Sequence, residues 1–406
     1  MHAAKPRIII VGAGPAGIVC ALALSKHGIP VTVFEQEAAP VQDQRAASIH
    51  PPTLEMLDEI GVTANIIDKG LVSPKYRYHD RPDGRVVAEF DLGELRDEFR
   101  FPFVLQYEQY KLTDAIFRTY ADGADFDVRF SHRVISMIQD ADGVTVEVQA
   151  GGETEHHRAD YVIGCDGGRS TVRRLANIEF EGFRYPEKFI KIATSFDFAQ
   201  VNRDLVFRNY FSDPAEWCNL FKVRGTKPAG LWRAIFPIPE TEDDSVALDP
   251  DRVEQRLQRF FPKSGRYEIE YVNLYSVSQC VAKSFRHGRV LLAGDSAHVN
   301  NPIGGMGMNG GIHDAINLAG KLAQVLDGSA EDDILDKYDR QRRHVAVTYV
   351  QAQTIQNKRM LEERDPSVRT ANLDNLRRIA ENRDTAREFM RRASLLESLR
   401  SAAEIA

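Results

Sequence analysis

The sequence predicts an α/β protein with α+β elements, in which a helix-covered parallel sheet is joined to an inserted antiparallel sheet and to C-terminal helices. Three observations predict this architecture. The chain opens with a β-branched run and a glycine-rich turn, its middle is rich in aromatic residues that alternate with polar ones, and its last part is charged, glycine-free and helical in spacing. At 406 residues it is long enough for two units that share one core.

The opening stretch reads as a βαβ unit. Residues 7–11 predict a buried parallel strand, residues 18–27 predict a helix, and residues 31–34 predict a second strand. Between the first strand and the helix lies Gly12-Ala13-Gly14-Pro15-Ala16-Gly17, a G-x-G-x-x-G turn. Strand, turn, helix and second strand together predict a Rossmann-like dinucleotide site.

The spacing of this turn has a physical reason. Gly12 permits the tight turn, Gly14 lets a diphosphate approach the backbone, and Gly17 lets the helix pack closely on the strand. The diphosphate then lies on the unpaired N–H groups of the helix start. Glu35, at the end of the second strand, is placed to hold two ribose hydroxyls. The motif by itself does not separate FAD from NAD.

A second glycine-rich run lies far down the chain. Residues 289–292 predict a short strand, residues 294–309 read GDSAHVNNPIGGMGMN, and residues 310–326 predict a helix. An acidic residue, Asp295, therefore stands at a strand end, just before a helix start whose N–H groups are unpaired. The glycines let this backbone approach a flat ligand closely.

A third motif lies between the other two, at residues 161–174, which read YVIGCDGGRSTVRR. A β-rich run ends at Asp166-Gly167, and Ser170 can cap the helix that follows. Three arginines bring positive charge to this helix start. The pattern predicts a strand, a turn and a helix near the same ligand.

The three motifs together resemble those of the single-component FAD-dependent aromatic hydroxylases, the family built like para-hydroxybenzoate hydroxylase. The pattern G-D-[AS]-A-H, then Pro, then a glycine-rich turn ending in [LM]-N is the most specific of them. The resemblance implies that FAD is bound by Gly12, Gly14, Pro15, Ala16, Gly17, Glu35, Gln36, Arg45, Ala46, Gln106, Asp166, Gly167, Gly294, Asp295, Pro302, Gly305, Gly307, Met308 and Asn309.

The resemblance also implies individual roles. Glu35 would hold the adenosine ribose, Arg45 and Gln106 would touch the cofactor, and Asp295 would contact its ribityl and phosphate region. The helix beginning near residue 310 would point its positive end at the flavin pyrimidine and stabilise the anionic reduced form.

The segments between the motifs predict the remaining elements. Pro51 and Pro52 open a helix with an apolar stripe. Residues 75–91 predict a hairpin around a Pro-Asp-Gly turn, residues 104–120 predict a loop and then an amphipathic helix, and residues 126–148 predict strands joined by an Asp-Gly turn.

The predicted domains follow from these patterns and the resemblance. Residues 180–280 alternate apolar and polar side chains and predict an antiparallel sheet. From residue 345 onward the spacing predicts helices, interrupted at Pro366, that cover the flavin domain or meet a second subunit. We expect an FAD-binding domain at 1–74, 97–178 and 281–352, a substrate-binding sheet domain at 75–96 and 179–280, and a C-terminal helical segment at 353–406.

The resemblance implies an enzyme. A reduced nicotinamide, NADH or NADPH, would deliver hydride to FAD, dioxygen would form a flavin C4a-hydroperoxide, and one oxygen atom would pass to a small phenolic or heteroaromatic substrate. A FAD-dependent oxidase, reductase or epoxidase of the same fold is the alternative. A FAD-binding protein without enzymatic activity would bind the cofactor but never turn over a nicotinamide.

The substrate pocket is predicted less directly than the flavin site. The resemblance places Ser48 and His50 near the isoalloxazine, although a polar residue at a helix start also commonly faces water. Asn300 and Asn301, before Pro302, replace an apolar residue and a proline of para-hydroxybenzoate hydroxylase and could hydrogen-bond a substrate. No catalytic base stands out. Strand alternation suggests further pocket residues at Tyr210, Asn219, Phe221 and Trp232.

Composition argues against several other classes of protein. The net charge of −7 disfavours a nucleic-acid-binding face. The four cysteines lie far apart in the sequence, so neither disulfides nor a metal cluster is expected, as suits a reducing cytoplasm. No secretory signal or membrane-spanning apolar run is found. We expect a cytoplasmic monomer or homodimer that needs no metal.

Overall fold

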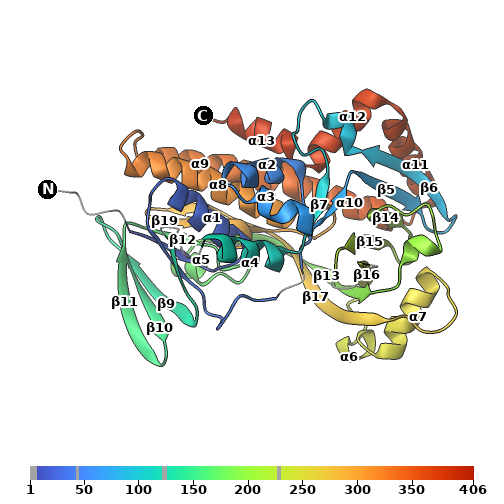
Figure 1. The fold of residues 1–406 in the computed structure, drawn as a ribbon, viewed down its shortest axis with the longest axis horizontal. Helices are drawn as coiled ribbons and strands as arrows, with labels where there is room; N and C mark the ends of the chain where they lie inside the picture. Colours follow the sequence, from blue (N-terminus) through green and yellow to red (C-terminus); the bar gives the residue numbers. More distant parts are fainter. Residues whose placement is uncertain (1–6, 43–44, 121–125, 226–229) are drawn as a thin grey trace.

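The amino-terminal βαβ unit forms part of a parallel sheet that lies left of the centre in Figure 1. The computed structural model describes residues 7–42, 45–120, 126–225 and 230–406. Within these residues the sheet has six strands in the order β18-β19-β12-β1-β2-β8, and only the edge strand β18 is antiparallel to its neighbour. The strands are β1 (Ile8–Val11), β2 (Val31–Phe34), β8 (Phe126–Arg129), β12 (Tyr161–Gly164), β18 (Arg286–His287) and β19 (Val290–Leu292).

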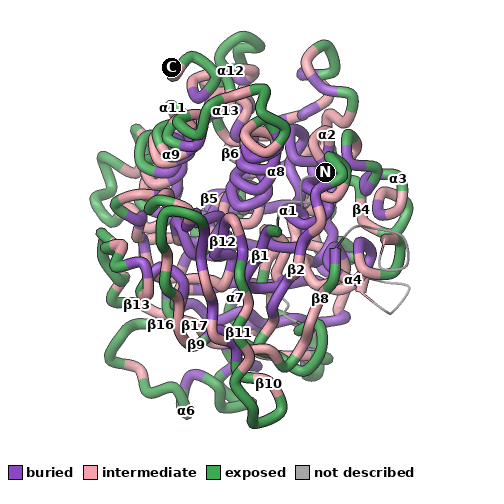
Figure 2. The backbone as a smooth tube through the Cα atoms, turned by 90° about the vertical axis from the view of Figure 1, so that its left-hand side faces the viewer, coloured by how far each residue is buried: buried purple, intermediate pink, exposed green. Residues whose placement is uncertain are grey.

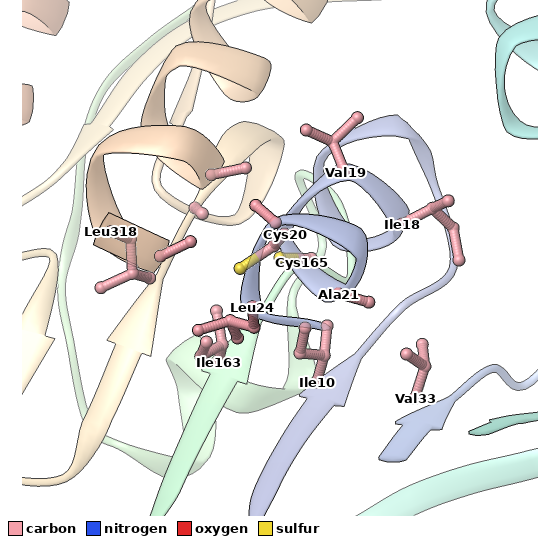
Figure 3. Close-up of a cluster of buried hydrophobic side chains, with 14 of the residues drawn as sticks. Ile10, Ile18, Val19, Cys20, Ala21, Leu24, Val33, Ile163, Cys165 and Leu318 are labelled. Carbon is pink, nitrogen blue, oxygen red and sulfur yellow. The ribbon is translucent and has the colours of Figure 1, made fainter. Parts of the chain in front are cut away.

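Helices α1 (Pro15–Lys26) and α8 (Met306–Leu326) cover one face of this sheet. Figure 3 shows Ile10, Val33 and Ile163 of the strands packed beneath α1, with Leu318 of α8 beside them. All four side chains are fully buried. Burial of each side chain contributes about 1.5–3 kcal/mol to stability. This layer therefore holds the glycine-rich turn (residues 12–17) and the later flavin motif (residues 294–309) against one core.

A separate antiparallel sheet covers the other face. Its strands β9 (His132–Gln139), β10 (Val144–Ala150) and β11 (Glu153–Ala159) form a meander that extends from one end of the molecule (Figure 1). The side chains that point inward from β10 are fully buried valines, whereas those of β11 are mostly exposed and polar. This alternation is what a sheet with one wet face requires.

The middle of the chain forms the antiparallel sheet that the sequence predicts. The described strands run in the order β20-β17-β13-β16-β15-β14-β5-β6, and only β14 and β5 pair in parallel. Because β20 belongs to the predicted flavin motif, this sheet is continuous with that motif. The strands are β5 (Lys75–Asp80), β6 (Arg85–Asp91), β13 (Phe180–Thr194), β14 (Arg208–Ser212), β15 (Cys218–Val223), β16 (Leu231–Ile238), β17 (Ile269–Ala282) and β20 (His298–Val299).

Helices lie on both faces of this sheet (Figure 1). One face packs on α7 (Pro250–Phe260), a helix that the sequence pattern did not predict. The other face packs on the C-terminal helices, which are joined to α9 (Ile334–His344) through a π-helical stretch, η5 (Val345–Gln351). These helices are α10 (Ala352–Glu362), α11 (Pro366–Glu381), α12 (Arg383–Ala393) and α13 (Leu396–Ala403).

Buried and charged contacts fasten the C-terminal helices to the sheet. Phe389 of α12 stacks on Phe90 of β6 with the ring centroids 4.4 Å apart. Glu98 accepts hydrogen bonds from Arg387, Arg391 and Arg400, at 2.5–3.0 Å. The helices therefore cover one face of the sheet rather than extending into solvent.

The structure corrects the predicted start of α8 and adds one small sheet. The helix begins at Met306, not near Gly310, because Gly305 with a φ of 72° caps it. Gly311 then lies inside the helix, where a Cβ would come within 3.0 Å of the Gly294 Cα. Instead of a loop before α4, strand β7 (Val104–Gln106) pairs with β3 (Ser48–Ile49) and β4 (Leu71–Ser73).

The remaining described helices connect these layers. Figure 2 shows that α8 and the central strands are buried while the connecting helices are exposed on their outer sides. No helix in the described ranges is both long and apolar enough to cross a bilayer. The connecting helices are α2 (Pro51–Glu59), α3 (Thr63–Ile66), η1 (Ile67–Lys69), η2 (Leu92–Leu95), α4 (Gln109–Tyr120), α5 (Thr171–Leu175), η3 (Phe198–Gln200), α6 (Asp244–Ala247), η4 (Gly294–Ser296) and α9 (Ile334–His344).

Two buried histidines predict how stability depends on pH. Burial lowers the pKa of His313 to about 3 and that of His79 to about 4. Both stay neutral in the folded protein, whereas in the unfolded chain they bind a proton below about pH 6.5. Their stabilisation is therefore present above that pH and is lost as the pH falls toward the folded values. In urea titrations we expect the free energy of unfolding to fall from pH 7 to pH 5, by up to about 1.4 kcal/mol per pH unit for each histidine.

The His313→Gln variant is the control for this pH dependence. It removes one titrating group, so the free energy of unfolding should depend less steeply on pH. A stability that stays constant or rises between pH 7 and pH 5 would contradict the prediction.

Candidate active site

The three predicted motifs meet at one edge of the parallel sheet. Strand β1 lies between β2 and β12, and β12 lies between β1 and β19. Because these strands are parallel, their carboxyl ends point the same way, which places Gly12, Glu35, Asp166 and Asp295 along a single edge. This is the edge at which open α/β sheets bind their ligands.

The glycines of the first turn divide into two kinds. A Cβ on Gly12, whose φ is 103°, would lie 2.5 Å from the carbonyl oxygen of Cys165, and one on Gly17 would lie 2.0 Å from that of Gly12. These two glycines are needed by the fold itself. A Cβ on Gly14, in contrast, would meet no described atom within 4 Å. The space beside Gly14 is open for a ligand.

Replacing Gly14 by alanine should therefore separate cofactor binding from folding. Its φ of −70° and ψ of 179° suit any residue, so we expect the free energy of unfolding of the cofactor-free protein to change by less than about 0.5 kcal/mol. The new methyl group would stand where the diphosphate approaches, and the Kd for FAD should rise about tenfold or more. Flavin fluorescence titration measures the affinity; an unchanged Kd would contradict this assignment.

Glu35 is held in position and retains free acceptor capacity. One carboxylate oxygen accepts a hydrogen bond from Ala13 N at 2.8 Å, and the other accepts from Glu37 N at 3.0 Å. A carboxylate has about four acceptor positions, so both oxygens can still bind ribose hydroxyls. Gln36 follows and is exposed.

Asp166 has a structural role at the third motif. Its Oδ1 accepts from Ser170 Oγ at 2.5 Å, and its Oδ2 accepts from Thr171 N at 2.6 Å. Ser170 caps α5 by accepting from Arg173 N, as predicted. The Asp166 side chain is therefore engaged in holding the turn, and Gly167, with a φ of 80°, follows as part of it.

A buried charge network anchors the later flavin motif. Asp314 of α8 accepts from Gly294 N at 3.0 Å and from Arg342 Nε at 2.6 Å, and it lies 2.7 Å from His298 Nε2. Burial alone would raise the pKa of Asp314, but the charges of His298 and Arg342 outweigh it and lower that pKa. Asp295, in contrast, is exposed toward the ligand edge. Neither Asp314 nor Arg342 is among the predicted residues; the signal for Asp314 is a lone acid in a helix of small and apolar residues.

Asn309 ties the flavin motif to the segment around α2. Its Oδ1 accepts from His50 N at 2.9 Å, and its Nδ2 donates to the carbonyls of Ser48 at 2.8 Å and Gly305 at 2.6 Å. With these bonds the side chain positions two predicted flavin-flanking segments. Ser48 in turn donates to Gln106 Oε1 at 2.7 Å.

Gln106 carries a buried donor that no protein group uses. It is fully buried, and its Nε2 has no hydrogen-bond partner in the described chain. A buried unpartnered donor costs about 1–3 kcal/mol, so it indicates a missing ligand acceptor. Arg45 and Ala46, which are also predicted to touch the cofactor, lie just before strand β3. Arg45 is exposed.

The two asparagines before Pro302 differ in what they can do. Asn301 is fully buried and turned inward: its Nδ2 donates to Thr354 O at 3.0 Å and to Tyr185 Oη at 3.2 Å, and its Oδ1 accepts from Ile303 N. The Asn301 side chain is therefore already bonded within the fold, and its contact with substrate stays a prediction. Asn300 still presents an unpartnered Oδ1, 3.4 Å from a Cβ built on Gly307.

The predicted pocket residues do not all share one face of the antiparallel sheet. Tyr210 pairs directly with Asn219, and Phe221 is two residues further along the same strand, so these three point to the side of the C-terminal helices. Trp232 pairs with Lys222 and points the other way; its indole donates to Asp197 at 2.9 Å within the core under α7. Trp232 is therefore not on the face that carries Tyr210, Asn219 and Phe221.

Three residues that the sequence patterns did not single out complete this face. Arg208 lies two residues before Tyr210 on β14, and Tyr76 and Tyr78 lie on the neighbouring β5. Burial raises the pKa of both tyrosines, although the Arg208 charge opposes it. Strand alternation could have identified these three residues in the sequence, because residues two positions apart along a strand lie on the same face.

Buried polar atoms without partners concentrate here. Within the described chain, the hydroxyl of Tyr76, Nε of Arg208 and Oδ1 of Asn219 have no hydrogen-bond partner, and both ring nitrogens of His50 lack a well-formed hydrogen bond. Native proteins pair most buried polar groups, so such a concentration marks a place where a polar ligand binds. A crevice of about 570 Å³ between β1, β2 and β11 contains none of the predicted site residues and is not this site.

These features fit FAD. The open space beside Gly14, the free capacity of Glu35, the exposed Asp295 and the unpartnered Gln106 Nε2 lie along the sheet edge and the adjoining β7. The cofactor would run from the first glycine turn to the segment of Gly305, beside the antiparallel sheet.

Comparisons with known proteins agree with this site. A family model described as "FAD binding domain" matches residues 5–353. The para-nitrophenol 4-monooxygenase of Pseudomonas sp. (strain WBC-3) is 31% identical over 386 residues, which is 94% of each chain. The 6-hydroxy-3-succinoylpyridine 3-monooxygenase HspB of Pseudomonas putida (strain DSM 28022 / S16) is 30% identical over 407 residues, covering 97% of this chain and 99% of that one.

A solved structure shows the same architecture. The crystal structure of p-nitrophenol 4-monooxygenase PnpA from Pseudomonas putida DLL-E4 superimposes with a TM-score of 0.89 at 29% identity, covering 96% of this chain and 99% of that one. The predicted fold class and family are confirmed. The chain belongs to the FAD binding domain family and, within it, to the single-component FAD-dependent aromatic monooxygenases.

Proposed function

We propose that this enzyme uses NAD(P)H and dioxygen to hydroxylate a small phenolic or heteroaromatic substrate. The observation that carries the proposal is the buried face of incompletely paired polar groups, His50, Tyr76, Arg208 and Asn219, beside the flavin motif. The names of two relatives support the substrate class, since para-nitrophenol is a phenol and 6-hydroxy-3-succinoylpyridine is a hydroxylated heteroaromatic ring.

The cofactor and the chain divide the work. When bound, FAD supplies the redox chemistry that takes electrons from NAD(P)H and activates dioxygen. The chain orients the ring and keeps water away: Ile303 of the flavin motif packs in one apolar cluster with Tyr210 of the sheet and with Leu361 and Met390 of the C-terminal helices. The start of α8 at Met306 brings a positive helix end to the Gly305 segment, which favours a negatively charged ring system there.

The predicted division into domains gives each part a task. We assign cofactor binding to residues 1–74, 97–178 and 281–352, substrate binding to residues 75–96 and 179–280, and closure of the site to residues 353–406.

The decisive experiment measures NAD(P)H oxidation by the FAD-loaded protein across a panel of phenols, aromatic acids and hydroxypyridines. We expect one class to stimulate oxidation and to yield a hydroxylated product that carries ¹⁸O from ¹⁸O₂. NAD(P)H oxidation that continues without dioxygen would instead identify a reductase. Hydrogen peroxide as the only oxygen product, with no hydroxylated compound, would identify an oxidase.

A further inference from the structure

A buried arginine on the substrate-facing sheet has no acidic partner. Arg208 is 5% exposed, and no described carboxylate lies within 4 Å of its guanidinium. Its Nη2 donates a hydrogen bond to Tyr210 Oη at 2.9 Å, and its guanidinium carbon lies 5.4 Å from the centroid of the Tyr76 ring. Its Nε has no hydrogen-bond partner in the described chain. Burying an unpaired cation is costly, so this position indicates a bound anion.

A buried imidazole on the flavin side lies within electrostatic range of this cation. His50 is the N-cap residue of α2 and is 1% exposed, and its backbone N is fixed by Asn309. Its Nε2 lies 3.5 Å from the position of a Cβ built on Gly305, so the ring stands against the predicted flavin segment. Both ring nitrogens are buried without a well-formed hydrogen bond to the described chain.

The groups around His50 keep it neutral. Burial lowers its pKa, and the charges of Arg208 on β14 and His313 on α8 lower it further. The carbonyls of Gly304 and Ser394 oppose this shift without reversing it, and no carboxylate contributes. A neutral imidazole carries one nitrogen that can accept a proton.

We propose that His50 accepts the proton of the substrate's ring hydroxyl and that Arg208 holds the oxyanion that results. This inference rests on the proposed function and specifies its substrate class, an aromatic ring with an ionisable hydroxyl. The O–H bond breaks, an N–H bond forms on His50, and the electron pair stays on the oxygen, so no oxidant or reductant takes part. The oxyanion then lies between two cations.

This arrangement suits a hydroxyl better than a carboxylate. A carboxylate is already ionised at neutral pH, so Arg208 alone would bind it and His50 would have no task. A phenol needs both an acceptor for its proton and a cation for its oxygen. A phenolate ring is also far more electron-rich than a phenol, which favours attack on an electrophilic oxygen.

The test uses 4-nitrophenol as a chromophoric probe, bound to the oxidised, FAD-loaded protein without NAD(P)H. The phenolate form absorbs at longer wavelength than the phenol, so a pH titration yields the apparent pKa of the bound probe. We expect the wild-type protein to bind phenolate at a pH where the free probe is neutral. His50→Asn and Arg208→Met should each raise the apparent pKa by about one unit or more, and Arg208→Lys by less.

Two controls separate this role from a structural one. 4-Nitroanisole cannot ionise, and it should bind His50→Asn, Arg208→Met and wild-type protein with similar Kd. His156→Asn, on the exposed strand β11, should leave the apparent pKa unchanged. The inference would be overturned if the apparent pKa of the probe were unaltered in the His50 and Arg208 variants, or if wild-type protein did not perturb the probe. It would also be overturned if these variants lost 4-nitroanisole binding to the same extent as 4-nitrophenol binding.

The outcome also distinguishes this inference from the function on which it rests. Hydroxylated product from the wild-type enzyme, together with an unaltered probe pKa in both variants, refutes the roles of His50 and Arg208 alone. Absence of NAD(P)H oxidation with every phenol refutes the proposed function instead.

Discussion

Replacement of Asp314 by alanine is expected to lower the free energy of unfolding by about 3–5 kcal/mol. The carboxylate is fully buried and is bonded to Arg342, whose side chain is 1% exposed, and to His298. Without it, a buried guanidinium loses its counter-charge and Gly294 N loses its acceptor. Urea unfolding followed by circular dichroism measures the change, and the flavin content of the purified protein should fall with it because Gly294 opens the flavin motif.

The matched control is Asp336→Ala. Asp336 also pairs with an arginine, Arg286, at 2.9 Å, but its side chain is 57% exposed. Exposed pairs contribute about 0–1 kcal/mol, so this variant should remain close to wild type. If the two substitutions lowered the free energy of unfolding equally, burial would not determine how much the Asp314 network contributes to stability.

Gly12→Ala is expected to damage both the fold and cofactor binding. Alanine at a φ of 103° costs about 1–3 kcal/mol in backbone strain, and its Cβ would lie 2.5 Å from a backbone oxygen that cannot easily move, which adds about 1–3 kcal/mol. We expect a loss of about 2–6 kcal/mol in unfolding free energy. Binding of FAD should be lost as well, since the turn carries the diphosphate.

Comparison with Gly14→Ala isolates the cause. Both variants add one methyl group two residues apart, but only Gly14 has open space around it. Destabilisation of the cofactor-free protein by Gly12→Ala and not by Gly14→Ala would show that the two glycines have different tasks. Equal destabilisation would argue against the positions assigned to them.

Local patterns were sufficient to predict the framework of the flavin site. The G-x-G-x-x-G turn, the Asp-Gly motif and the later glycine run each follow a short apolar strand, and parallel pairing alone then brings the strand ends to one edge. The start of α8 was predicted near Gly310 but lies at Met306. The glycines in this stretch suggested a loop, whereas the structure needs them inside the helix. There they allow close packing on Gly294 and His298.

The residues of the proposed substrate site could not be predicted from the sequence with the same success. Strand alternation predicts that side chains lie on two faces, but the pairing register decides which face meets the flavin. Trp232 stands opposite Lys222 while Arg233 stands opposite Phe221, so one residue of register separates the buried core from the proposed site. Arg208 shares the face of Tyr210 for the same reason.

The sequence by itself therefore determined that this chain has a dinucleotide site, because each motif depends on glycines and acids within a few residues of one another. That the dinucleotide is FAD followed from the resemblance of the three motifs, taken together, to the family. Only the tertiary structure decided that Asn301 is turned into the core, that Asp314 meets Arg342, and that Arg208 lies within electrostatic range of His50. Those relations join residues far apart in the chain. Their energies come from burial and from charge partners that exist only once the layers have packed.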